Sequence, residues 1–509
     1  MRWWSQRIDR RTRPGLRIGS FELSSASSAG QHSISPWRAV CFFLLAAGFT
    51  ISRILYARWN SFDDGETMWQ IVDFNLLRTH LTQSIFYLHS QPPLLNLFLG
   101  MVLKLTPDPG HVPYVLQSFY RLMGFSLMLM MFQLMLDLGA PEGIAVALTL
   151  LFEFNPGTLM LENLCYTACP SQLLFCGSAF GLYRFLERGK PWIGLAFLTC
   201  AALPIFLNSS FQPLWFICVA GFCYYTVSKR FREMLPAMAM IAGLIAILVI
   251  KNATVFGIYT TSSWFGMNLA RVTMPLIWSE NIRHEVLAGE LSGFALIQPF
   301  EPLDKYPMEK SPPTGIPVLD TRAKGNGTCN YNNILYINIS QHYLKDAIYS
   351  LIHHPDAYLH EMVRTCGCYF GTVKDQDSRK SVRLGAWNHL YDLILQPAAL
   401  SWWPRQQRCD WVDLSLLIGV PLILLLTAIR LARAVEWNAS DIAIAFILMT
   451  ITYTSVMALM FEIGENPRFR SVVDPLFLVL LGSLLGDLYR RVGPRLNSGL
   501  LAHSRGADA

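Results

Sequence analysis

The sequence predicts an all-α integral membrane protein with about ten membrane-spanning helices. Hydrophobic residues make up 52% of its 509 residues and charged residues only 15%, whereas soluble domains carry about 25% charge. Apolar runs of roughly 17 to 25 residues, the length at which a helix crosses a bilayer, recur along the chain. Basic residues flank these runs, so the net charge of +6 indicates membrane orientation rather than nucleic-acid binding.

The expected spans follow one another with mostly short connections. Their ranges are 38–57, 114–137, 142–160, 168–187, 191–207, 211–227, 234–254, 412–430, 440–460 and 471–489. Basic residues precede span one and follow spans four, six, eight and ten. All five basic groups fall on one side of the membrane if both termini are cytoplasmic, as the positive-inside rule favours. We therefore expect a multi-pass protein of a bacterial inner or plasma membrane, or of the endoplasmic reticulum membrane in a eukaryote.

These connections divide the chain into five parts. They are a cytoplasmic tail at 1–36, an N-terminal transmembrane module at 37–254 with a first outer loop at 58–92, an extracytoplasmic loop or cap at 255–411, C-terminal transmembrane helices at 412–490 and a cytoplasmic tail at 491–509. The first tail is rich in Arg and Ser, which is typical of disorder, and a targeting peptide is the alternative. The cap is too long for a connector and is expected to hold short helices, one of them over 340–370.

The cap also contains the cysteines and histidines that could form disulfides or bind a metal. Its cysteines are Cys329, Cys366, Cys368 and Cys409. In an oxidising compartment one or two disulfides are expected among them, with the pairing left open. The stretch His353–Glu361 resembles a set of metal ligands, but HExxH is not completed, and Pro355 favours a helix start with His354 near its cap. No metal site is predicted.

Acidic residues follow span one closely in the first outer loop. Asp63, Asp64 and Glu66 lie a few residues beyond its end. A partly desolvated carboxylate near the bilayer surface can take a proton from an acceptor group, so Asp63 or Asp64 is predicted to be a general base. The alternative is that one of them caps a helix over Thr67–Leu77, and both roles can hold at once.

A helix lying in the membrane interface is expected after this acidic segment. It runs from Leu76 to Leu88, and the double proline Pro92-Pro93 prevents it from continuing. Proline at a first helical position then favours a second interfacial or re-entrant helix over 93–105.

Charged residues also cluster in the last outer loop, between spans nine and ten. They are Glu462, Glu465, Arg468 and Arg470. Arginine keeps its charge and can form two parallel hydrogen bonds to a phosphate, so Arg468 and Arg470 are predicted to bind one. The alternatives are an internal Glu–Arg ion-pair cluster and contacts to lipid headgroups.

Three further residues could contact a substrate or lipid. Trp264 and Asn268 could bind a sugar, and anchoring of the aromatic ring at the membrane surface is the alternative. Arg53, at or near the end of span one, is expected to reach toward the interface or a lipid phosphate.

Several of these segments resemble the GT-C glycosyltransferases. The acidic residues after span one, the interfacial helix and the segment His89-Ser90-Gln91-Pro92-Pro93-Leu94 are similar to the first-loop region of protein O-mannosyltransferases, lipid A aminoarabinose transferases and related polyprenyl-phosphate sugar transferases. ENPRFRSVVDPLFLVL at 465–480 is similar to their E-x-x-R-[YF]-R-x-x-x-x-P-L block, and Pro355–Leu359 resembles a helix start in their long loop. The resemblance is best over the first 105 residues and the last 50.

This resemblance implies an inverting transfer of a sugar from a polyprenyl-phosphate donor to a protein, lipid-glycan or polysaccharide acceptor outside the cytoplasm, without a cofactor. Asp63 or Asp64 would deprotonate the acceptor, and Arg468 and Arg470 would hold the departing phosphate. Other expected substrate contacts are Glu66, His89, Gln91, Trp264, Asn268 and Glu465. The family often has Asp-Glu where this chain has Asp63-Asp64-Gly65-Glu66, which leaves open which carboxylate is the base.

Two other functions are compatible with the sequence. A transporter or lipid flippase would show ionisable residues near mid-membrane, inverted repeats and matched broken spans, whereas the sequence shows little charge inside the spans and no repeat. A non-catalytic membrane scaffold is the third possibility, and loss of the acidic pair without effect would favour it.

Overall fold

The computed structural model describes residues 36–58, 60–227, 230–274, 282–307, 312–371, 414–463 and 465–506. The chain forms two units, Met1–Val40 and Cys41–Ala509. In the described ranges the regular elements are helices, and the extended pairing is limited to two isolated bridges, Asp63 with Leu164 and Ala323 with Cys329. The all-α prediction is confirmed for this part of the chain, and nearly all of the expected tail at 1–36 lies outside it.

Five helical segments in the described ranges are long and apolar enough to cross a membrane. They are α2 (Pro36–Ala57), η1 with α6 (Pro109–His111 and Val112–Asp137), α12 (Phe231–Phe256), α19 (Leu414–Arg433) and α20 (Ala439–Phe461). A sixth span is possible if α7 (Glu142–Glu153) and α8 (Pro156–Glu162), bent by 62° to each other, cross together. These helices agree with a multi-pass membrane protein, but the prediction of ten spans is wrong for the described residues.

The remaining predicted spans fail for reasons of length or composition. α10 (Pro191–Leu207), with 17 residues, is at the lower limit for a bilayer core about 30 Å thick, and α11 (Pro213–Thr226), with 14, is below it. α9 (Ala168–Arg188) is long enough, but it buries Ser171, Gln172 and Ser178. It packs against α6, α10 and α20, so protein rather than lipid surrounds it. α22 (Asp474–Gly506) is longer than the predicted tenth span and carries several arginines.

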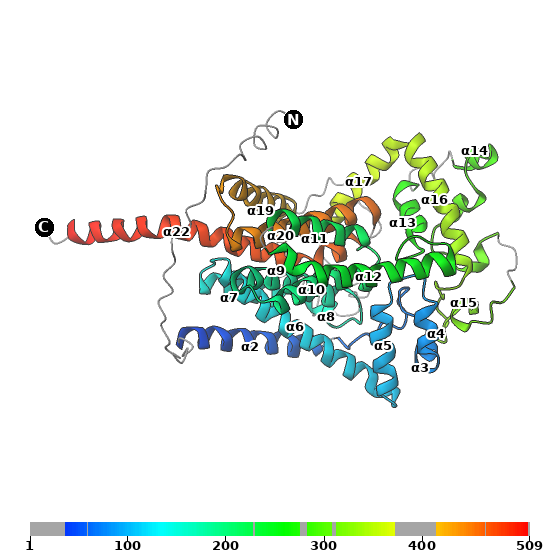
Figure 1. Ribbon diagram of the computed structural model, residues 1–509, viewed down its shortest axis with the longest axis horizontal. Helices are drawn as coiled ribbons and strands as arrows, with labels where there is room; N and C mark the ends of the chain where they lie inside the picture. Colours follow the sequence, from blue (N-terminus) through cyan, green and yellow to red (C-terminus); the bar gives the residue numbers. More distant parts are fainter. Residues whose placement is uncertain are drawn as a thin grey trace. The chain divides into compact units, whose positions relative to one another are not determined.

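The helices of the first loop and the cap gather at one end of the bundle within the larger unit (Figure 1). First-loop helices there are α3 (Phe74–Thr79), α4 (Leu81–Phe86) and α5 (Leu94–Leu105). Cap elements are α13 (Phe265–Thr273), α14 (Ile282–Leu287), η3 (Gly293–Leu296), η4 (Leu303–Lys305), α15 (Pro317–Asp320), α16 (Leu335–His353) and α17 (Pro355–Tyr369). The expected short helices of the cap are therefore present in its described part.

Two helices start at or beside a proline; Pro355 takes the predicted position, whereas Pro93 lies one residue before the helix rather than at its first position. Pro93 is the N-cap of α5, and Pro355 is the first residue of α17, directly after His354. The predicted helix over Thr67–Leu77 is wrong, because this stretch forms turns until Asp73.

Asp73, rather than an earlier carboxylate, caps the first helix of the loop. Its side chain accepts hydrogen bonds from the backbone N–H groups of Asn75 and Leu76, which the first turn of α3 leaves unpaired. The predicted interfacial helix over Leu76–Leu88 is instead two short helices that meet at His80.

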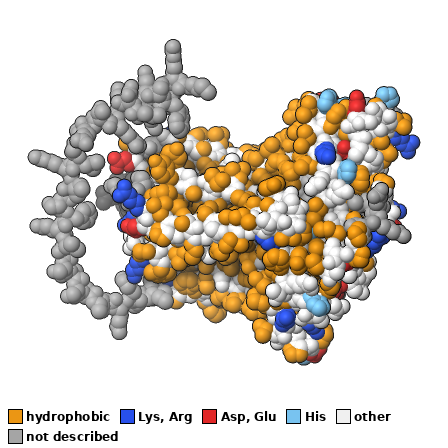
Figure 2. Space-filling model, turned by 45° about the vertical axis from the view of Figure 1, so that its right-hand side comes forward, with side chains coloured by type: hydrophobic (Ala, Val, Ile, Leu, Met, Phe, Trp, Pro, Cys, Tyr) orange, Lys and Arg blue, Asp and Glu red, His pale blue; other side chains and the backbone are white. Residues whose placement is uncertain are grey.

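Hydrophobic side chains cover most of the face of the molecule drawn in Figure 2, and most of its charged side chains lie at the two ends. Phe43, Ile247 and Tyr225 are among the large apolar residues exposed on the bundle helices. An exposed apolar surface of this kind suits contact with lipid hydrocarbon, where charged side chains are unfavourable.

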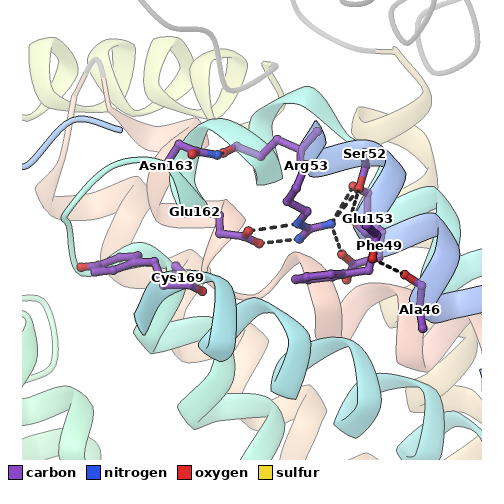
Figure 3. Close-up of polar contacts among 11 residues, drawn as sticks. Ala46, Phe49, Ser52, Arg53, Glu153, Glu162, Asn163 and Cys169 are labelled. Carbon is purple, nitrogen blue, oxygen red and sulfur yellow. Dashed lines mark hydrogen bonds and ion pairs between the residues drawn. The ribbon is translucent and has the colours of Figure 1, made fainter. Parts of the chain in front are cut away.

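A buried ion-pair network joins three of the bundle helices (Figure 3). Arg53 of α2 donates from Nε to Glu162 Oε1 at 3.0 Å and pairs through Nη2 with Oε2 of the same residue. Its Nη1 lies 2.5 Å from Glu153 Oε2, and its guanidinium lies 3.8 Å from the centroid of the Phe49 ring. Arg53 is therefore buried among protein groups rather than extended toward the interface as expected.

Gly124 of α6 leaves the space that this network occupies. A Cβ atom at that position would collide with the Glu162 carboxylate. The absence of a side chain at position 124 thus allows α6 to pack against α8.

We expect Arg53→Met to destabilise the fold by about 3 to 5 kcal/mol, because it leaves two carboxylates buried without their cation. The midpoint of thermal unfolding in detergent measures this effect. Arg433→Met, at an exposed position near the end of α19, is the control and should leave the midpoint unchanged. Equal midpoints for the two variants would contradict a stabilising role of the network.

Candidate functional site

A cavity of about 220 Å³ lies where the first loop, the cap and the bundle meet. Leu214 of α11, together with Tyr453 and Met457 of α20, forms part of its wall from helices of the bundle. Other walls come from the first loop, from α13 and from the segment around α21 (Asn466–Ser471). The cavity therefore combines apolar groups of the bundle with polar groups of the outer segments.

The cavity brings together half of the site residues predicted from the sequence. Those in its lining are Gln91, Trp264, Asn268, Glu465 and Arg468. The predicted residues outside the lining are Asp63, Asp64, Glu66, His89 and Arg470. Segments separated by more than three hundred residues therefore meet here, as the motifs in the first and last outer loops suggested.

Two arginines line the cavity, and each is paired with a glutamate. Arg271 donates from Nη1 to Glu462 Oε1 at 3.2 Å and from Nη2 to the Ile463 carbonyl at 2.7 Å. Arg468 pairs with Glu465 three residues earlier. The charges of the two pairs cancel, so the cavity presents cations that already have anionic partners.

Burial changes the proton affinity of one of these carboxylates. Loss of water around Glu462 raises the pKa of its carboxyl to about 7, although the positive charge of Arg271 opposes the change. Glu462 therefore gains or loses a proton near neutral pH.

Arg468 and Arg470 have different surroundings although they are two residues apart. Arg468 lines the cavity, with its guanidinium carbon 4.3 Å from the centroid of the Tyr166 ring. Arg470 is buried and donates from Nη1 to the carbonyls of Tyr369 and Gly371 at 2.7 and 2.8 Å. Arg470 thus fastens the end of α17 to the bundle, and of the two it is Arg468 that can reach a ligand.

The acidic first-loop residues lie outside the cavity lining, and Asp63 is exposed. Asp63 Oδ1 accepts from the Gly65 N–H and Asp64 Oδ1 from the Glu66 N–H, at 2.8 and 3.1 Å. Asp63 also pairs through its backbone with Asn163 and Cys165, and the next residue, Tyr166, lines the cavity. The link between Asp63 and the segment before Tyr166 is therefore made by its backbone and not by its carboxylate.

Gly65 makes this acidic turn possible. Its φ of 76° lies in the left-handed region, and a Cβ atom there would lie 2.6 Å from the Cys165 carbonyl oxygen. The glycine that separates Asp64 from Glu66 is therefore required by the fold of the loop.

The carboxyl of Glu66 lies in a different environment from the carboxyls of the two aspartates. Partial burial, with the nearby charges of Asp64 and Asp73, raises the pKa of its carboxyl, and Lys324 opposes this. Lys324 donates from Nζ to the carbonyls of Glu66 and Met68 at 3.0 and 2.7 Å. The cap is thereby attached to the acidic loop through a lysine.

His89 is part of the same attachment between first loop and cap. Its Nδ1 lies 2.8 Å from Ser263 Oγ and its Nε2 lies 3.0 Å from the Asn332 carbonyl, so Nε2 donates and Nδ1 accepts. Complete burial lowers the pKa of its imidazole to about 3, which keeps the ring neutral. These contacts show that His89 has a structural role, and it has no direct access to the cavity.

The sequence analysis did not single out Trp69, Tyr166 or Arg271. A signal for Arg271 exists, because Trp264, Asn268 and Arg271 are spaced four and then three residues apart, which places them on one face of α13. Trp69 and Tyr166 lie in irregular segments, where no such periodicity points to a common surface.

The structure tests the cysteine and metal predictions in part. Cys368 is disulfide-bonded, whereas Cys329 and Cys366 are free thiols and Cys409 lies outside the described residues. In the described part of the chain, no three His, Cys, Asp or Glu side chains are grouped to hold a metal ion. His354 instead lies 2.7 Å from Glu285 Oε1.

Comparison of the chain with models of protein families, with curated proteins and with solved structures finds no match. The resemblance to GT-C glycosyltransferases therefore stays a prediction from the sequence motifs.

Arg470→Ala should lower the free energy of unfolding by about 3 kcal/mol, since two carbonyls and Asp474 lose a buried cationic donor. Arg468→Ala should change it by no more than about 1 kcal/mol, because its partner Glu465 is partly exposed. Chemical unfolding of both variants in detergent measures the difference. A larger loss for Arg468→Ala would contradict the assignment of Arg470 as the structural residue.

Proposed function

We propose that this chain is a membrane glycosyltransferase, which moves a sugar from a polyprenyl-phosphate donor to an extracytoplasmic acceptor with inversion. The observation that carries the proposal is the mixed lining of the cavity. A lipid-linked sugar phosphate has an apolar chain, an anionic link and a polar sugar. The cavity offers apolar side chains from α11 and α20, the arginines Arg271 and Arg468, and several amides with aromatic rings.

The two arginines supply what a phosphate leaving group needs. As the bond between sugar C1 and the phosphate oxygen breaks, its electron pair moves to the phosphate and negative charge grows there. Positioned cations stabilise that charge most where water is excluded. In this proposal Arg468 and Arg271 bind the phosphate in place of their glutamate partners, and Arg470 supports the helix end behind them.

A carboxylate of the first loop serves as the base. The acceptor oxygen or nitrogen forms the new bond to C1 from the face opposite the departing phosphate, which inverts the configuration. The acceptor proton goes to Asp63 or Asp64. The backbone of Asp63 is hydrogen-bonded to the segment just before Tyr166, so in this proposal the acceptor approaches the cavity along this edge.

Further support comes from the disulfide at Cys368. Disulfides persist in oxidising compartments, so this bond is typical of a cap outside the cytoplasm. The acidic loop is attached to the same cap through Lys324 and His89, and both would then face the compartment in which the acceptor is found.

A second candidate, a transporter or lipid flippase, is favoured by one observation. Arg53, Glu153 and Glu162 are buried charges inside helices of the bundle, and α7 and α8 form a broken helix pair beside them. Buried charges and broken helices are typical of transport pathways. Transport of a lipid-linked sugar without turnover in sealed vesicles would select this function.

The affinity for the donor should depend on pH through Glu462. Below a pH of about 7 its carboxyl is protonated and leaves Arg271 available for the phosphate. Above that pH the carboxylate competes for the same guanidinium. We expect the donor KM to rise up to about tenfold between about pH 6 and pH 8, with a much smaller rise in Glu462→Gln. An identical pH profile for both proteins would argue against this competition.

Replacement of the proposed base should abolish turnover. Asp63→Asn or Asp64→Asn, whichever removes the base, should lower kcat by about a hundredfold or more, as loss of a general base commonly does. The measurement is sugar release from a panel of radiolabelled polyprenyl-phosphate sugars by purified protein in detergent with candidate acceptors. Asp108→Asn, at an exposed turn before η1, is the matched control. Wild-type turnover in both single variants and the double variant would refute the assignment.

A further inference from the structure

An aromatic surface lines the cavity where the first loop meets the cap. The rings of Trp69 and Phe300 stack with centroids 5.2 Å apart and planes 25° apart, and Tyr331 lies 5.1 Å from Trp69. Trp264 meets Phe300 edge to face at 5.1 Å. Trp69 is nevertheless 41% exposed, although a large aromatic ring with such contacts would normally be covered.

The backbone of Phe300 is in an unusual conformation. Its φ of 67° makes it the single non-glycine residue with positive φ in the described ranges. That region is unfavourable for a bulky residue and would suit glycine without strain. The Tyr331 hydroxyl donates to the Phe300 carbonyl at 2.7 Å and holds the turn in place. Local strain of this kind is typical of functional sites, and here it places a ring under the exposed indole.

Unpaired amides lie around the same cavity. Gln70, Gln91 and Asn268 all line it, and within the described part of the chain no hydrogen bond is formed by their side chains. Gln91 is only 7% exposed, so its amide has little access to solvent other than through the cavity. Gln91 is thus a buried amide without a protein partner, whereas Gln70 and Asn268 are half-buried and can also bond to water.

We propose that Trp69, supported by Phe300, is a stacking platform for the pyranose ring of a neutral sugar, whose hydroxyls bind the amides of Gln70, Gln91 and Asn268. A pyranose has an apolar C–H face that matches an aromatic ring and a rim of hydroxyls that matches uncharged donors and acceptors. The sugar is neutral because the groups proposed to bind its hydroxyls are uncharged amides. This inference rests on the proposed function and adds the class of sugar and its position.

Binding can be tested without turnover. Methyl hexopyranosides, methyl glucuronide and methyl glucosaminide are titrated into the full chain in detergent, with saturation-transfer NMR as the readout. We expect the neutral glycosides to bind, Trp69→Ala to weaken them about tenfold, and Trp69→Phe to restore most of the affinity. Trp192→Ala, which removes an exposed indole outside the cavity lining, is the matched control. Equal binding by wild type and Trp69→Ala, absence of binding, or preference for a charged glycoside would overturn the proposal.

Kinetics then separate the two sugars that could occupy the platform. If the transferred sugar stacks there, Trp69→Ala raises the donor KM; if a glycan acceptor does, it raises the acceptor KM. Active enzyme with both constants unchanged overturns the platform and leaves the transferase function intact. Conversely, neutral sugar binding that depends on Trp69 in a protein without turnover supports the platform and counts against the transferase function.

Discussion

The guanidinium of Arg53 is held between two buried carboxylates, and the outer part of the structure depends on this arrangement. Glu153 and Glu162 end the two halves of the bent helix pair, so one cation fixes both halves against α2. Asn163 follows Glu162 directly, and its carbonyl accepts from the Asp63 N–H. The position of the acidic loop is thereby determined by an ion pair inside the bundle, where exchange of its partners for water is unfavourable.

Much of the fold could be predicted because a helix in contact with lipid hydrocarbon must carry mainly apolar side chains. A helix that faces hydrocarbon must be apolar on that surface, so α2, α12 and α19 stand out as long apolar runs. Helices inside the bundle are free of that restriction. α9 buries serines and a glutamine against neighbouring helices, and α10 is shorter than a membrane is thick, so hydropathy along the chain overestimated the number of spans.

Residue type and position in the chain were sufficient to predict site residues of which half lie in the cavity lining. Arg468 and Arg470 were assigned the same role because their chemistry is identical. Residues two apart on a helix face different directions, so only Arg468 reaches the cavity while Arg470 fastens α17. Trp69 and Phe300 are separated by the whole N-terminal half of the bundle, and no local pattern relates them before the cap has folded onto the first loop.

This long-range attachment has a consequence for biosynthesis. The His89 backbone bonds to the side chain of Asn332, 243 residues later in the chain. At roughly 5 to 20 residues per second, the first loop would emerge on the order of ten to fifty seconds before its partner is made. During that interval Gln91 and the His89 ring have no cap to cover them. Nascent chains stalled before Asn332 would therefore be natural clients for chaperones in the compartment that the first loop faces.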